Sequence, residues 1–327
     1  MPAAAIAVVV GLAGCAASAA TTPAPARRAA PAAAPQTARH GPPYAVGERV
    51  ITFVDHSRTV RYPGRSPQPR TLVTVVRYPA VGPASRVDVR DAPPDRADGP
   101  FPLVVFGHGF AVTPATYYRL LRAWTAAGYV VAAPVFPLEN AHAPGGPNES
   151  DLVNQPRDMS VVISGMLAAS TSPHALLVKM IDPWAVAVAG QSDGGETALA
   201  AAYDRHFRDA RVRAAVILSG AQIPGQHALT FPRGAPALLA TQGTADAINL
   251  PVHTSAFFRV AHRPKYLLWL IGAGHLPPYT GQQPQLSIVE RVSVAFLNRY
   301  LKGIRAGPAQ MRRAGTRPGT AALTADP

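Results

Sequence analysis

A serine stands at position 192 with glycine two residues before it and two residues after it, in the segment Gly-Gln-Ser-Asp-Gly-Gly at 190–195. An apolar strand-like run precedes this segment and a helix-like run follows it. A G-x-S-x-G sequence at such a junction forms a tight turn that lifts the serine hydroxyl clear of a sheet. The N-terminus of the following helix would stabilise negative charge that develops there during acyl transfer. Ser192 is therefore the candidate nucleophile.

A serine hydroxyl needs a general base, and the base needs an acid that orients it. Where the nucleophile occupies a strand-to-helix turn, the acid and then the base follow it along the chain. Asp246 lies just beyond the strand-like residues 236–240, and His275 follows the glycine-rich residues 272–274 after the last strand-like run. Both would lie at the carboxyl end of a strand. The sequence therefore predicts a triad of Ser192, Asp246 and His275.

Four other histidines compete with His275 for the role of base. Each precedes the candidate acid or flanks a helix on the wrong side of the last strand; these are His206, His227, His253 and His262. We expect them to be surface or capping residues.

An oxyanion hole in such a site takes one backbone N–H from the residue after the nucleophile and one from the loop after an earlier strand. Asp193 would supply the first. Residues 107–110, Gly-His-Gly-Phe, follow the apolar run 103–106, and we expect Phe110 to supply the second. His108 precedes the serine, which is the wrong order for the base, so we expect it to brace this loop.

The elements that must position these residues alternate along the chain. Runs rich in β-branched residues at 51–54 and 71–76 predict an opening antiparallel pair, and later continuous apolar runs predict buried parallel strands. These later strands span 103–106, 129–133, 184–189, 212–218, 236–240 and 265–271, and the predicted helices span 117–127, 156–167, 196–203 and 286–301. The sequence thus predicts an α/β fold, a doubly wound and mostly parallel sheet of about eight strands with helices on both faces. In such sheets, catalytic groups lie at the carboxyl ends of the strands.

The composition suits one globular catalytic domain. Hydrophobic residues make up 48% of the 327 residues and charged residues only 15%, which is enough apolar material for a large core. The formal charge of +13 comes mostly from arginines that stand singly; the only adjacent pairs noted are Arg27-Arg28 and Arg312-Arg313. Because no dense basic stripe with interleaved aromatic residues is present, we expect no nucleic-acid partner.

The two ends differ from the middle. Residues 1–15 combine an apolar run, which predicts an export signal, with the tetrapeptide Leu-Ala-Gly-Cys. This tetrapeptide resembles the lipobox of bacterial lipoproteins, and the resemblance implies cleavage before Cys15 and lipidation of its thiol. Cleavage as an ordinary secretory signal is the alternative, and the absence of a basic start departs from both patterns. Residues 16–44 read as a disordered Ala/Pro-rich tether, 45–302 as the catalytic domain and 303–327 as a disordered tail. The protein would be exported and either lipid-anchored on the outer face of the cytoplasmic membrane or secreted.

Several segments together resemble the α/β-hydrolase superfamily. They are 101–110, 126–131, Arg157-Asp158, 190–195, 243–246 and Gly274-His275. The resemblance covers about residues 46–300 and is nearest to the lidless esterases: platelet-activating-factor acetylhydrolase homologues, dienelactone hydrolase, chlorophyllase and cutinases. It implies hydrolysis of carboxylic esters through an acyl-enzyme, with no metal and no cofactor.

The chain departs from these relatives at three points. Gln191 stands where many relatives have histidine, and we expect its side chain to face away from the chemistry. Asp193 would bring a carboxylate beside the oxyanion hole, where it disfavours negative charge unless it turns outward. The single cysteine excludes the disulfides of cutinases, so polyester cleavage is not carried over.

The substrate site is expected to be open, without a large lid domain. The segment 219–235 is short and rich in proline and glycine, and the longer loop 136–154 would form one rim. Besides Phe110, the predicted apolar contacts are Tyr117, Trp184 and Ile248, although Trp184 would alternatively pack in the core. The substrate would be a small-molecule or lipid ester.

Two alternatives to an esterase stay open. An acyltransferase would use the same triad and differ only in which hydroxyl reaches the acyl-enzyme. A non-catalytic envelope lipoprotein would keep the scaffold alone, but the presence of all three triad residues argues against it. We expect a monomer.

Overall fold

Strands and helices alternate along most of the chain. The computed structural model describes residues 41–221 and 228–327. Within them the strands are β1 (Ala45–Val60), β2 (Gln68–Ala80), β3 (Val89–Arg90), β4 (Phe101–Gly107), β5 (Val130–Val135), β6 (Ile181–Gln191), β7 (Val212–Leu218), β8 (Ala237–Gly243), β9 (Lys265–Leu270) and β10 (Ala321–Asp326). The α-helices are α1 (Tyr118–Ala126), α2 (Gln155–Thr171), α3 (Asp193–Tyr203), α4 (Pro251–Val260), α5 (Pro277–Thr280), α6 (Gln285–Leu301) and α7 (Gly307–Gly315). Two 3₁₀ helices, η1 (Pro114–Tyr117) and η2 (Glu149–Asn154), precede α1 and α2.

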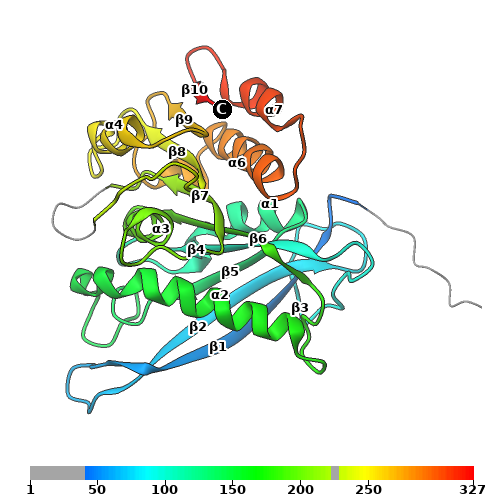
Figure 1. Cartoon of the computed structure of the whole chain (residues 1–327), viewed down its shortest axis with the longest axis vertical. Helices are drawn as coiled ribbons and strands as arrows, with labels where there is room; N and C mark the ends of the chain where they lie inside the picture. The colour runs from blue at the N-terminus through cyan, green and yellow to red at the C-terminus, as the bar shows by residue number, and fades with distance from the viewer. Residues whose placement is uncertain (1–40, 222–227) are drawn as a thin grey trace, which may run out of the picture. The chain divides into compact units, whose positions relative to one another are not determined.

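All ten strands form one sheet in the order β10-β9-β8-β7-β6-β4-β5-β2-β1-β3 (Figure 1). The six strands β4 to β9 lie side by side in this sheet and pair in parallel. β2 joins β5 in antiparallel orientation, and β1 pairs antiparallel with β2. The parallel strands are buried on both faces, which explains why their sequences are continuous apolar runs and not alternating ones.

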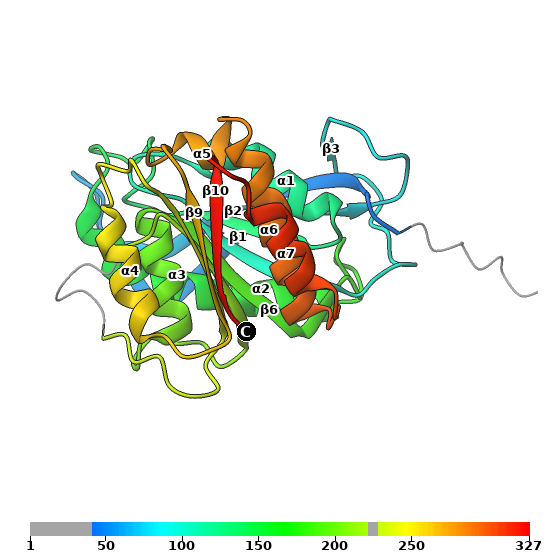
Figure 2. The same cartoon turned by 90° about the horizontal axis from the view of Figure 1, so that it is seen from above.

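Helices cover both faces of the sheet, as Figure 2 shows, with α3 and α4 on one side and α1, α6 and α7 on the other. One apolar core lies under α2, α3 and α4 and contains Met159, Val162 and Phe257. The second lies under α1, α6 and α7 and contains Trp124, Phe296 and Met311. The predicted doubly wound α/β fold is therefore confirmed.

The C-terminal residues are ordered, so the prediction of a disordered tail at 303–327 is wrong. α7 packs on α6, with Met311 fully buried, and β10 pairs antiparallel with β9 from Ala321 opposite Leu270 to Asp326 opposite Lys265. With β3 at the other edge, β10 raises the number of strands from the predicted eight to ten. The apolar residues of this segment are mostly small alanines, so its local sequence shows little periodicity; pairing with β9 and packing on α6 order it.

The connection between β7 and β8 contains no helix within its described residues, 219–221 and 228–236. The predicted signal segment, Cys15 and the tether up to residue 40 lie outside the described residues. In the part of the chain that is described, none of the helices combines the length and the apolar character needed to cross a bilayer.

Candidate active site

Ser192 occupies the turn between β6 and α3, with φ of 56° and ψ of −122°. Its N–H donates to the carbonyl of Leu218 in the neighbouring strand β7, at 3.0 Å. A Cβ on Gly190 would overlap the carbonyl of Gly194, and a Cβ on Gly194 would overlap the carbonyl of Gly107. Glycine is thus required at 190 because β6 meets the first turn of α3 there, and at 194 because that turn packs directly against β4.

The three predicted triad residues come together in hydrogen-bonding succession. Nε2 of His275 lies 2.9 Å from Oγ of Ser192, and Nδ1 of His275 lies 2.8 Å from Oδ2 of Asp246. A carboxylate can only accept, so Nδ1–H donates to Asp246 and Nε2 accepts from the serine hydroxyl. This is the arrangement in which an imidazole removes the proton of an attacking serine.

Asp246 is held as an ionised group. Its side chain is fully buried, and its Oδ1 accepts from the N–H groups of Ile248 and Asn249, both at 3.0 Å. Gln242 Nε2 donates to Oδ2 at 3.1 Å. Burial alone would raise the pKa of Asp246, but the hydrogen bond from His275, its charge when protonated, and the N–H of Ile248 lower the pKa below its ordinary value. The acid therefore remains a carboxylate that orients the imidazole.

Gln191 reaches the imidazole, which corrects the expectation that its side chain faces away. Its Nε2 donates to the carbonyl of His275 at 3.2 Å and lies 3.3 Å from Nε2 of the same residue. Its Oε1 accepts from the hydroxyl of Tyr117 at 2.7 Å, and that hydroxyl accepts from the N–H of Gly109 at 3.3 Å. A chain of hydrogen bonds therefore joins the loop after β4 to the loop that carries the base.

The two predicted oxyanion donors flank the serine. Asp193 is the first residue of α3, so its N–H has no acceptor within the helix. Phe110 follows β4 and is 43% exposed. His108 braces this loop from inside: Nδ1 donates to the Gly109 carbonyl at 2.8 Å, and Nε2 accepts from the N–H of Phe136 at 3.0 Å. Complete burial lowers the pKa of His108 to about 4, so the ring is neutral at ordinary pH.

A pocket of about 340 Å³ opens onto the serine hydroxyl. It is lined by Phe110, Glu149, Ser192, Asp193, Glu196, Ala221, Ile248 and Asn249. Its walls are apolar at Phe110 and Ile248 and acidic at Glu149, Asp193 and Glu196. No lysine or arginine lines it among the described residues, so its electrostatic character is negative.

Of the three predicted substrate contacts, the structure brings only Ile248 to this pocket. Ile248 is 70% exposed on the pocket wall. Tyr117 is fully buried and serves the hydrogen-bond chain described above, so it does not face the pocket. Trp184 lies near the amino end of β6, the end remote from Ser192, and is 76% exposed. It therefore belongs neither to the site nor to the core.

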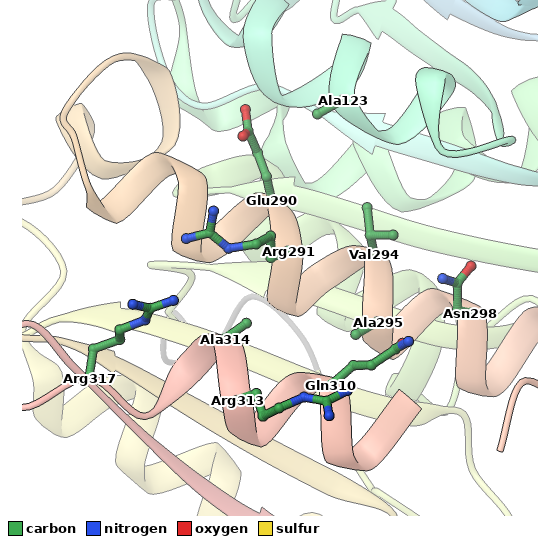
Figure 3. Close-up of a pocket in the computed structure, with 10 residues that line it drawn as sticks. All are labelled: Ala123, Glu290, Arg291, Val294, Ala295, Asn298, Gln310, Arg313, Ala314 and Arg317. Atoms are coloured by element: carbon green, nitrogen blue, oxygen red, sulfur yellow. The ribbon is translucent and has the colours of Figure 1, made fainter. Parts of the chain in front are cut away.

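A second, larger pocket of about 560 Å³ lies between α1, α6 and α7 (Figure 3). Its floor is formed by small apolar side chains, including Ala295 and Ala314, and three arginines stand around it: Arg291, Arg313 and Arg317. None of the predicted site residues lines it. In the described part of the chain, no group of three or more His, Cys, Asp and Glu side chains is arranged to hold a metal ion.

Comparison with known proteins agrees with this architecture. The family model for chlorophyllase matches residues 84–253, just over half of the chain; the match includes Ser192 and Asp246 and ends before His275. Among the solved structures, a ferulic acid esterase from Streptomyces cinnamoneus superimposes with a TM-score of 0.57 over 84% of this chain and 93% of that chain, at 22% sequence identity. No curated protein matches the chain.

The structural match supports the fold, and the family match supports the general class of activity. The serine turn after β6 and the order serine, aspartate, histidine along the chain are those of the α/β-hydrolase fold. The chain therefore belongs to the chlorophyllase family, a family of carboxylic ester hydrolases with the α/β-hydrolase fold.

Proposed function

We propose that the protein is a serine esterase that cleaves carboxylic esters through an acyl-enzyme formed on Ser192. The observation that supports this proposal best is the hydrogen-bonded succession of Ser192, His275 and Asp246, with distances of 2.9 Å and 2.8 Å. Three side chains from separate loops adopt the order that nucleophilic acyl transfer requires.

In the first half of the reaction, Nε2 of His275 removes the proton of Ser192 Oγ while this oxygen attacks the ester carbonyl. The carbonyl oxygen becomes negatively charged and accepts from the N–H groups of Asp193 and Phe110. His275, now protonated, gives its proton to the leaving alcohol, and the acyl group remains on Ser192. Asp246 stabilises the imidazolium through Nδ1–H and does not itself take the proton.

In the second half, a water molecule gives a proton to Nε2 of His275 and attacks the acyl carbonyl. The tetrahedral intermediate collapses, Ser192 recovers its proton from His275, and the carboxylic acid leaves. An alcohol in place of water would give a new ester, which is the acyltransferase reaction. The narrow pocket favours a short or slender acyl group, and the negative walls favour a neutral or cationic ester.

Activity towards p-nitrophenyl esters of graded acyl length tests this proposal directly. Ser192→Ala should retain the fold, checked by circular dichroism, and should lose turnover and labelling by a fluorophosphonate probe. Arg312→Ala, an exposed change on α7, serves as the matched control and should behave as the wild type. Undiminished turnover in the Ser192 variant would exclude the mechanism.

We further propose that the protein is exported and anchored to a membrane through a lipid on Cys15. The support is the sequence Leu-Ala-Gly-Cys after an apolar run. Two acyl chains on one residue suffice for stable anchoring. Metabolic labelling with palmitate should mark the wild-type protein in the membrane fraction and leave Cys15→Ser unlabelled. A wild-type protein that stays unlabelled would favour cleavage as an ordinary secretory signal.

A further inference from the structure

Glu139 is a buried carboxyl group whose oxygens have no N–H or O–H donor among the described residues. Its side chain is 0% exposed, in the loop between β5 and η2. Within the described residues, neither of its carboxylate oxygens receives a hydrogen bond from an N–H or O–H group, and the same is true of Oδ2 of Asp193. The carboxyl group of Asp193 lies close enough to that of Glu139 to raise the pKa of Glu139, both by its charge and through a hydrogen bond between the two groups. Ionised carboxylates have only acceptors, so this contact requires a proton on one of the two.

The charged groups around Glu139 identify which carboxyl holds that proton. The groups whose charges act on it are the carboxylates of Asp193, Asp151 and Glu149, and the buried phenol of Tyr117 also lies within range. Arg70 is the cation beside Asp151, and it donates to both carboxylate oxygens of Asp151, at 2.9 Å and 2.7 Å. Its charge is therefore paired with Asp151 and not with Glu139. Burial first, and then Asp193 and the other carboxylates, raise the pKa of Glu139 to about 10. Glu139 is therefore neutral at ordinary pH.

The backbone of Glu139 contacts the other side of the site. Its carbonyl accepts from the N–H of Ala111 at 3.0 Å, immediately after Phe110. A second bond, from the N–H of Ala141 to the carbonyl of Val112 at 3.2 Å, runs beside it. Glu139 thus contacts Asp193 through its side chain and the neighbour of Phe110 through its main chain. These are the two residues that would supply the oxyanion donors.

We propose that Glu139 is a positioning residue that acts as a neutral carboxylic acid: it donates to the carboxylate of Asp193 while its carbonyl holds Ala111, and so fixes the spacing between the two oxyanion donors. This inference rests on the proposed function of Ser192. The shared proton also limits the pair to one negative charge, which is spread over two carboxyl groups. The pair has the same net charge as a lone carboxylate at position 193, but the O–H that Glu139 donates partly neutralises that carboxylate and so weakens its opposition to the charge of the oxyanion.

Infrared spectroscopy tests the shared proton without any need for catalysis. The wild-type protein at neutral pH should show a carbonyl band of a protonated carboxylic acid, and Glu139→Gln should lack it. Asp193→Asn should shift the band, because Glu139 stays buried and protonated but then contacts an amide in place of a carboxylate. Glu149→Gln, a change in an exposed acid on the pocket wall, is the matched control and should keep the band. A band absent from the wild type, or retained in Glu139→Gln, would overturn the proposal.

The pH profile of kcat tests the positioning role. Glutamine keeps a donor towards Asp193 and cannot ionise, so Glu139→Gln should keep kcat within about threefold of the wild type at neutral pH, whereas Glu139→Ala should lose roughly tenfold or more. The wild type should lose activity as the pH approaches 10, and Glu139→Gln should not. The background rate of ester hydrolysis at each pH is measured with Ser192→Ala and subtracted. Glu290→Gln, far from the site on α6, should follow the wild type.

Two results would contradict the positioning role. One is a glutamine variant as impaired as the alanine variant, and the other is an alkaline loss of activity that is identical in the wild type and Glu139→Gln. A wild-type protein with no esterase activity would instead remove the proposed function, and the infrared band would still decide whether Glu139 holds the proton.

Discussion

The hydroxyl of Tyr117 donates to Oε1 of Gln191 at 2.7 Å, and this bond connects two parts of the site that are far apart in the chain. On one side the same hydroxyl accepts from Gly109 in the loop after β4. On the other, Gln191 donates to the carbonyl of His275. The position of the base is therefore coupled to the loop that carries Phe110, through groups that do not touch the substrate.

Removing this hydroxyl should impair the site more than the core. In Tyr117→Phe, Oε1 of Gln191 and the N–H of Gly109 lose their partner, which should cost about 1–3 kcal/mol of unfolding free energy. We expect kcat to fall roughly tenfold with little change in KM, because the catalytic groups shift while the pocket walls remain. Urea unfolding and steady-state kinetics measure the two effects. Tyr118→Phe, whose hydroxyl donates to Arg86 at the surface, is the control; equal losses in both variants would refute the coupling.

The acid of the triad should matter as much for orientation as for charge. In Asp246→Asn the amide oxygen stays with the N–H groups of Ile248 and Asn249, so the amide NH2 faces Nδ1 of His275 and donates to it; the imidazole should then change its tautomer and no longer accept from Ser192. We expect kcat to fall by about 10³–10⁴-fold with the fold retained. Burst kinetics with a p-nitrophenyl ester would show whether the acylation step is the one affected. A loss below tenfold would mean that another group orients His275.

Glu139 should make the protein less stable as the pH rises. Its pKa moves from an ordinary 4.5 to about 10 on folding, so between these values the folded protein binds a proton that the unfolded chain has released. The free energy of unfolding then falls with rising pH, by at most about 1.4 kcal/mol per pH unit. Below the ordinary pKa of glutamate, both the folded and the unfolded chain hold the proton, so Glu139 no longer makes the free energy of unfolding depend on pH.

Urea unfolding of wild type and Glu139→Gln between about pH 5 and about pH 8 would measure it. The advantage of the glutamine variant should grow steadily across this range, whereas Glu149→Gln should show a much smaller change, because the charge of Glu149 is the weakest of the named causes of the raised pKa. A constant difference between Glu139→Gln and the wild type would show that Glu139 ionises normally in the folded protein.

The negative pocket should discriminate against anionic esters. A p-nitrophenyl ester of succinic acid, with one free carboxylate, should have a kcat/KM roughly tenfold below that of the butyrate ester of similar length, because it meets the carboxyl groups of Glu149 and Asp193. Glu149→Gln should reduce the ratio of kcat/KM for the butyrate ester to that for the succinate ester, and the remote Glu290→Gln should leave this ratio unchanged. Equal rates for the two esters would contradict this prediction.

The ordered C-terminal segment should contribute to stability. Met311 is fully buried between α7 and the second core, so Met311→Ala should cost about 2–5 kcal/mol. Arg312→Ala, at the next and exposed position, should change stability by less than about 0.5 kcal/mol. Thermal and urea unfolding would compare them. Similar stabilities of the two variants would mean that the segment is not packed as described.

The sequence predicted those features that depend on local rules. Glycine at 190 and 194 marks the turn because any side chain there meets backbone, and the continuous apolar runs mark the buried parallel strands. Asp246 and His275 were found from their positions just after two such strands, and the structure brings both to Ser192. Their catalytic roles remain a proposal until the variants are measured.

Features that depend on contacts between distant segments were missed. Trp184 was predicted as a substrate contact from its apolar character alone, but β6 begins at Ile181 and leaves it exposed at the far end of the strand. Nothing in the sequence around Glu139 shows that Asp193 is its neighbour, because the two residues lie 54 positions apart in the chain. A glutamate in a loop after a strand does not by itself indicate a functional residue, because its burial and its neighbours are known only from the structure.

The backbone of Ser192 has a cost that the rest of the fold must offset. A positive φ of 56° with a ψ of −122° is a conformation that side chains with a Cβ rarely adopt, and holding it costs on the order of 1–3 kcal/mol. Glycine would adopt it freely, so a Ser192→Gly chain should unfold at a higher temperature than the enzyme it came from. On the proposed function, the side chain that would attack the ester is therefore also the one that lowers the thermal stability of the protein.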